Sequence, residues 1–140
     1  MKFLTIAYAL KIKSIFKEVE PKINAIILST LNNKKIEKVI NAVYPYAEKA
    51  FQEGIDFGNF LTSRKVEHQL IGRDKKIIFQ KFINSLNTAS KVFYLKVDNL
   101  TDKGTPKYDA FFKEYVTTMS KATNRLIIDA GARGIRKAVR

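Results

Sequence analysis

The C-terminal segment decides the fold, and over residues 105–140 it reads TPKYDAFFKEYVTTMSKATNRLIIDAGARGIRKAVR. Thr105 and Pro106 are typical of a helix start, because threonine caps the first turn and proline fits its first position. Apolar residues then recur every three or four positions, as they do on one face of a helix. They are Tyr108, Phe111, Phe112, Tyr115, Val116, Met119, Leu126, Ile128, Ile135 and Val139. The pattern predicts one long helix, or two helices with a joint near 123–125.

The same periodicity occurs three times upstream of that segment. It predicts helices over 1–19, 34–53 and 75–87. Pro21 is expected to interrupt or restart the first helix, and Pro45 to kink or break the second, because proline lacks the amide proton of the helical hydrogen bond. The first helix carries apolar residues around much of its circumference, so we expect more than one of its sides to be covered.

Other signals mark helix ends and a change of period. Gly54 is a candidate stop for the second helix, and Asp74 is expected to cap the third. Residues 90–97 are rich in β-branched and aromatic side chains, which favours a strand. The sequence therefore predicts a mainly α fold: a single compact helical domain over 1–140, with about five helices, a minor strand near 90–97 and a long C-terminal helix.

Positive charge is the outlier of the composition. The 140 residues include 26 Lys+Arg and 13 Asp+Glu, for a net charge of +13. Fifteen basic and six acidic side chains follow residue 70, so most of the excess lies in the second half of the chain. Such a surplus repels itself and attracts polyanions. It points to nucleic acid, an acidic protein surface or an anionic membrane as partner; a generically basic surface is the alternative.

The densest basic cluster lies at the end of the predicted long helix. Four cations fall on one helical face at spacings of three and four: Arg133, Arg136, Lys137 and Arg140. Together with Arg125 they suit a phosphate backbone, an acidic groove or an anionic membrane surface. The alternative is a solvated helix end whose cations complement the helix dipole. Residues 123–140 are therefore a candidate projecting basic helix.

A second, smaller candidate interface surrounds two aromatic residues. Lys91 and Lys96 flank Phe93 and Tyr94, and an aromatic ring between cations can stack on a base of single-stranded nucleic acid. The alternative is that Tyr94 is a half-buried sheet residue. The candidate partner-binding residues are Arg125, Arg133, Arg136, Lys137, Arg140, Lys91 and Lys96.

The motif Gly131-Ala132-Arg133-Gly134 is similar to the GxxG loop with which KH domains clamp a nucleic-acid backbone. The spacing after the second glycine is shorter than in that family, and the sequence around it does not predict the strands of a KH fold. The favoured interpretation is that these small residues let the helix approach a neighbour closely.

Catalytic and metal-binding motifs are missing from the sequence. The single histidine, His68, is not framed by a serine or cysteine motif, and the chain contains no cysteine. Asp98, Asn99 and Asp102 resemble part of a calcium loop, but Leu100 occupies a position where that loop has a ligand. We therefore expect a protein that is not an enzyme and has no cofactor, no metal and no small-molecule substrate.

Composition and pattern together favour a structural role. We expect a subunit of a larger viral or nucleoprotein assembly, of the connector or ring type, that docks through its basic C-terminal helix. The alternative is a free-standing basic nucleic-acid-binding protein. Expected partners are other protein subunits, with homo-oligomerisation, and possible targets include nucleic acid. No classical signal or membrane span is recognisable, so we expect a soluble protein, intracellular or within a virion.

Overall fold

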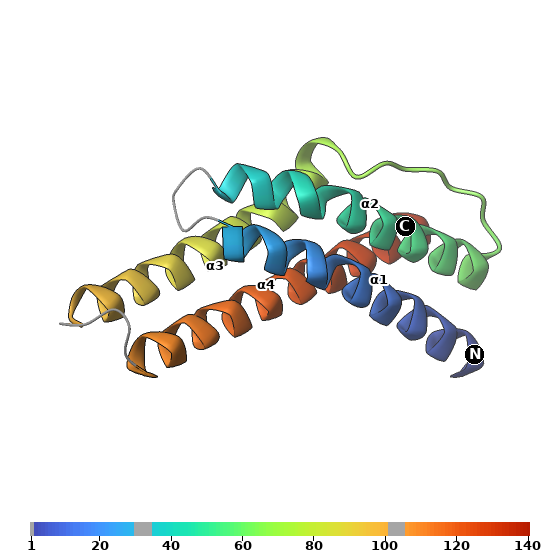
Figure 1. Ribbon diagram of the computed structural model, residues 1–140. Helices are drawn as coiled ribbons and strands as arrows, with labels where there is room; N and C mark the ends of the chain where they lie inside the picture. Colours follow the sequence, from blue (N-terminus) through green and yellow to red (C-terminus); the bar gives the residue numbers. More distant parts are fainter. Residues whose placement is uncertain (1, 30–34, 101–105) are drawn as a thin grey trace.

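The computed structural model describes residues 2–29, 35–100 and 106–140, and most of their backbone is helical (Figure 1). In these ranges the elements are α1 (Lys2–Ser29), α2 (Lys35–Thr62), α3 (Gly72–Asp98) and α4 (Pro106–Val139). The expected mainly α fold is confirmed. Four helices replace the expected five, because the C-terminal segment forms one uninterrupted helix without a joint near 123–125.

The strand expected near 90–97 is wrong, since these residues form the C-terminal turns of α3. Ala89, Phe93 and Val97 are buried at spacings of four, which is the period of a helix face. The Phe93 ring packs on Tyr115 of α4, with centroids 4.9 Å apart. The β-branched and aromatic residues of this segment therefore serve helix packing, and tertiary contacts override their strand preference.

The expected interruption at Pro21 is wrong, and Pro45 does not break its helix either; a kink at Pro45 stays a prediction. Pro21 lies inside α1 and Pro45 inside α2, and both are exposed. On the solvent side of a helix, water can satisfy the carbonyl that a proline leaves without a donor, so the helix continues. Gly54 is not a stop either, because α2 runs on to Thr62.

Helix α4 is the centre of the molecule and packs against the other three helices. Figure 1 shows its C-terminal half beside α1 and α2, and its N-terminal half paired with α3 in a hairpin that extends past both. Contact between α2 and α3 is slight and includes Tyr44 and Phe79, whose ring centroids are 6.0 Å apart. Fully buried side chains of the core are Ile15, Val19, Ile23, Val43, Phe51, Leu70, Leu86, Leu126 and Ile127.

Helices α2 and α4 come close together where they cross because glycine residues lie at the contact. A Cβ atom on Gly54 would fall inside contact distance of the Gly131 carbonyl oxygen, and one on Gly134 would meet the Phe51 carbonyl oxygen. The prediction of close helix approach is confirmed. The likeness to a KH loop does not hold, because both glycines of that motif are inside α4 and packed against a neighbour.

The connection between α2 and α3 is an extended strap over residues 63–71. Three side chains of α2 hold its carbonyl groups. The Tyr44 hydroxyl donates to Leu70 O (2.9 Å), Gln52 Nε2 to His68 O (2.7 Å), and Asn59 Nδ2 to Val66 O (2.8 Å). The strap thereby returns the chain along α2 and starts α3 beside the C-terminal end of α4.

Candidate functional site: the basic end of α3 and α4

The start of α3 and the end of α4 are joined through one carboxylate. Asp74 Oδ1 accepts a hydrogen bond from Arg133 Nε (2.7 Å), and its Oδ2 lies 3.1 Å from Lys137 Nζ. Asp74 is buried, while Arg133 and Lys137 remain partly exposed. Two of the predicted partner-binding cations therefore also connect two helices.

The surroundings of Asp74 keep it charged. Burial by itself raises the pKa of this carboxyl, but hydrogen bonds from Arg133 and Lys137, together with their positive charges, outweigh burial and lower the pKa. The expected capping role is wrong. Ile71 occupies the N-cap position without a side-chain hydrogen bond, and Asp74 lies in the first turn of α3, where its charge complements the helix dipole.

Two cations pair with this carboxylate and five more lie within three residues of Asp74 or Lys137 in the sequence; we call the seven the basic end. They are Arg73, Lys75, Lys76, Arg133, Arg136, Lys137 and Arg140. Asp74 is the one acidic side chain in residues 72–77 and 133–140. Arg73, Lys76, Arg136 and Arg140 are exposed, and among the described residues no carboxylate pairs with Arg136 or Arg140. The basic end therefore presents a local excess of positive charge to solvent.

The three cations of α3 were not among the residues predicted from the sequence. Arg73, Lys75 and Lys76 are adjacent in the sequence, and a run of basic residues is visible there. The packing of α3 on α4, with the ion pair between Asp74 and Arg133 across 59 residues, brings that run to the end of α4. Lys75 also packs its Nζ 4.2 Å from the centre of the Tyr44 ring, a cation–π contact that ties it to α2.

The C-terminal segment does not project from the molecule. Seven of its residues are buried within the helix packing: Thr123, Leu126, Ile127, Ala130, Gly131, Gly134 and Ala138. Arg125 lies beyond the basic end and pairs with Asp129, one turn later, at 3.2 Å. The segment 123–140 is thus a packed helix whose basic side chains lie along its exposed side and its end.

The other two predicted cations lie far from the basic end, toward the outer end of the α3–α4 hairpin. Lys96 pairs with Glu114 at 3.0 Å, whereas Lys91 is exposed. Phe93 is only 3% exposed and packs among aromatic rings of α4, so it cannot stack on a base. Tyr94, the ring expected to stack on a base, is 36% exposed, so stacking by Tyr94 stays a prediction. The seven predicted residues do not make one surface.

His68 is exposed on the strap, and no group of three His, Asp or Glu side chains among the described residues could hold a metal ion. Asp102 of the calcium-like sequence lies outside the described residues. None of the described helices is both long enough and apolar enough to cross a membrane.

Comparisons with protein-family models, curated proteins and solved structures find no match for this chain. What the chain does must therefore be inferred from the chemistry of its own surface. Two surface features stand out: the basic end, and the apolar side chains that the four helices leave uncovered.

Proposed function

We propose that this chain is a non-enzymatic structural subunit of a larger viral or nucleoprotein assembly, of the connector or ring type, and that it docks through the basic end. The observation that carries the proposal is the concentration of seven cations in the first turn of α3 and the last turns of α4, two segments that the Asp74 carboxylate joins. Like charges held this close repel one another, and a polyanionic neighbour would relieve the repulsion.

The exposed cations of the basic end are the docking groups. Arg133 and Lys137 are engaged with Asp74, whereas Arg136 and Arg140 extend into solvent on the same helix end. A guanidinium group offers a planar pair of donors that matches phosphate or carboxylate oxygens. Docking through Arg136 and Arg140 leaves the Asp74 ion pairs intact.

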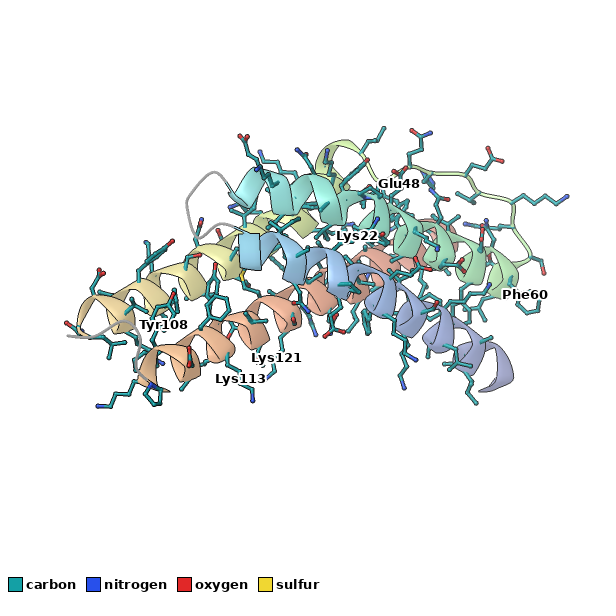
Figure 2. The ribbon with its side chains drawn as sticks, viewed as in Figure 1. Lys22, Glu48, Phe60, Tyr108, Lys113 and Lys121 are labelled. Atoms are coloured by element: carbon teal, nitrogen blue, oxygen red, sulfur yellow. The ribbon has the colours of Figure 1, made fainter. Side chains whose placement is uncertain are left out.

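Uncovered apolar residues at opposite ends of the molecule support membership of an assembly. Ile6 and Leu10 on α1 are 58% and 60% exposed, and Phe60 at the end of α2 is also exposed (Figure 2). At the outer end of the α3–α4 hairpin, Val92 and Leu95 are exposed. Grouped apolar side chains of this kind are characteristic of surfaces that meet another molecule.

A free-standing nucleic-acid-binding protein is the second candidate, and the same basic end favours it. The two candidates differ in self-assembly. An assembly subunit forms a discrete oligomer with or without DNA, whereas a free-standing binder changes mass only when DNA is added. Light scattering across a salt series, with and without duplex DNA, distinguishes them.

The docking surface itself is tested with two charge-matched variants. R136A/R140A removes two cations from the basic end, and K113A/K121A removes two exposed cations from the distant part of α4 (Figure 2). Binding to a labelled duplex and to polyglutamate is measured by fluorescence anisotropy across a salt series. We expect R136A/R140A to weaken duplex binding and to reduce the salt slope by about 2, at roughly 0.9 per phosphate contact.

The control variant decides between a site and a diffuse effect. K113A/K121A should change affinity much less than R136A/R140A, although both lower the net charge equally. Equal losses in the two variants would mean that total charge alone attracts the polyanion. Absence of binding to both the duplex and polyglutamate at low salt would reject the basic end as a docking surface.

A further inference from the structure

The outer face of the α3–α4 hairpin contains a groove that no other helix covers. A hollow of about 420 Å³ is lined by residues of α3 and α4 alone. Its floor includes Ala89, Phe93 and Tyr115, and Val92 at its edge is 43% exposed. In Figure 1 this part of the hairpin extends beyond the ends of α1 and α2.

The hollow continues toward the middle of the molecule. A second hollow, of about 390 Å³, shares Asn84 and Ser85 with the first and ends near Asp129. Together they form one trough, which we call the hairpin trough. From Phe111 to Asp129 it spans 18 residues of α4, about 27 Å at 1.5 Å per residue.

Two helices alone cannot enclose a core, because each buries only the side that faces the other. Aromatic packing between α3 and α4 fills the inner side, where Phe93 contacts Tyr108, Phe112 and Tyr115. The trough side is left open. Two such hairpins placed face to face would complete the arrangement of a four-helix bundle.

We propose that the occupant of the hairpin trough is the same trough of a second copy of this chain. The charges that line the trough favour this occupant. The chain has a net charge of +13, so two copies repel each other over most of their surface. The lining of the whole trough holds three cations and two anions, Lys81, Lys96, Arg125, Glu114 and Asp129, and is therefore nearly neutral. A copy meets little net repulsion there, and its own cations and anions can pair with these, whereas a purely acidic partner would face both anions.

The middle of the trough is suited to close approach. The shared region is bordered by small or short side chains, which let helices come near one another: Ser85, Thr88, Ala89, Thr118 and Ala122. A two-fold axis through this region brings the outer end of one trough onto the inner end of the other. Glu114 then faces Arg125 of the second copy, and Lys96 faces Asp129 of the second copy.

The size of the trough predicts a weak dimer. A face about 27 Å long and about 20 Å wide, the width of two helices, covers about 500 Å² in each copy. The total of about 1,000 Å² lies at the lower limit for a specific interface. We therefore expect dissociation in the micromolar range or above, and association that strengthens with salt, because salt screens the repulsion between the two basic chains.

This inference rests on the proposed function only in that an assembly subunit associates with itself. The two have opposite salt dependence, since polyanion binding at the basic end weakens as salt rises. A wild-type chain that binds DNA but does not dimerise would overturn the trough and leave the basic end standing.

Sedimentation equilibrium of matched variants tests the trough. V92K places a charge at its edge, and I128K places the same charge on α4 at a residue outside the trough with nearly equal exposure, 44%. We expect the wild-type mass to rise from one chain to two with concentration and salt. V92K should weaken dimerisation at least tenfold and I128K less than twofold. T88R, at an exposed residue of the trough, serves if V92K fails to fold.

Cysteine cross-linking adds an independent readout, because the chain has no cysteine of its own. A disulfide forms only where two Cα atoms approach within about 7 Å, so S85C should yield a covalent dimer on mild oxidation. S14C, on the exposed side of α1, is the control and should not. A wild-type chain that stays monomeric, equal effects of V92K and I128K, or equal cross-linking of S85C and S14C would each overturn the proposal.

Discussion

Replacing Gly54 with alanine tests whether the contact between α2 and α4 is as close as the structure indicates. The added Cβ would meet backbone atoms of α4: the Gly131 carbonyl oxygen inside contact distance, the Gly131 carbonyl carbon at 2.9 Å and the Ile135 nitrogen at 3.0 Å. Backbone atoms cannot rotate away as a side chain does. The two helices must therefore separate along the crossing on which the fold is centred.

The magnitude follows from two opposing terms. Overpacking a tight interior costs about 1–3 kcal/mol, and crowding by three backbone atoms places G54A toward the upper end. Alanine is favoured over glycine inside a helix by about 1 kcal/mol, which offsets part of that cost. We expect a net destabilisation of about 2 kcal/mol, or a fall in Tm of roughly 4–8 °C for a chain of this length.

Gly131, on the other side of the same crossing, provides the matched comparison. A Cβ there would meet the Tyr8 hydroxyl and the Ile12 Cδ1 atom, which are ends of side chains that can move. We expect G131A to cost less than about 1 kcal/mol, because the gain in helix propensity offsets most of the rearrangement. Urea and thermal unfolding of both variants, followed by circular dichroism, measure the difference. A G54A protein as stable as G131A would refute the close crossing.

Three further variants probe the ion pairs, the hairpin packing and a buried hydroxyl. Because the pKa of Asp74 is lowered, its contribution to stability is present above about pH 4 and is lost as pH falls through the folded-state pKa. The free energy of unfolding of D74N should therefore be lower than that of the wild type by about 1–3 kcal/mol at neutral pH, and the two values should converge in acid. D74N should also bind duplex DNA more tightly, because Arg133 and Lys137 are released. F93A removes the ring at the centre of the hairpin's aromatic cluster and should lower the free energy of unfolding by about 3–5 kcal/mol. Amide hydrogen exchange should rise more in the outer turns of α3 and α4 than at the α2–α4 crossing. Burial, with a smaller effect of the Glu53 charge, raises the pKa of Tyr8 to about 12, so stability present below about pH 10 is lost as pH rises through 12. Y8F should show a shallower loss of stability over that alkaline range, measured by urea unfolding at each pH.

Periodicity in the sequence predicted where helices lie but not where they end. The apolar stripe from Tyr108 to Val139 corresponds to α4, and its start at Pro106 is confirmed. Residues 90–97 were predicted as a strand, because their composition is that of a pleated surface and the aromatic partners on α4 are not visible in a local window. The sequence predicts an interruption or restart at Pro21 and a kink or break at Pro45, because a sequence does not show that both rings lie on the solvent side.

The sequence also predicted only part of the candidate site, because the rest depends on contacts between residues far apart in the chain. Helical spacing alone identified the cations at the end of α4, and two of them, Arg133 and Lys137, do lie together. Their partner is Asp74, 59 residues from Arg133, and its sequence context indicated a helix cap. The Asp74 contact depends on the strap, whose hydrogen bonds to Tyr44 and Asn59 have no sequence signature. Long-range pairing of this kind is decided by topology.

The cations at the end of α4 form two groups: those that pair with Asp74 and those that do not. Arg133 and Lys137 stabilise the contact between α3 and α4, and a partner that takes their hydrogen bonds must compete with Asp74 for them. Arg136 and Arg140 lie on the exposed side of the same turns and carry charge that nothing in the described chain neutralises. A polyanion that binds the second group where the fold holds these cations together binds the folded chain more tightly than the unfolded chain, so it should raise the free energy of unfolding by up to RT ln(1 + [L]/Kd). We therefore expect duplex DNA to raise the free energy of unfolding of the wild type and of K113A/K121A, and to raise it less in R136A/R140A. That result would show that DNA binding at Arg136 and Arg140 stabilises the pair of helices that carries them.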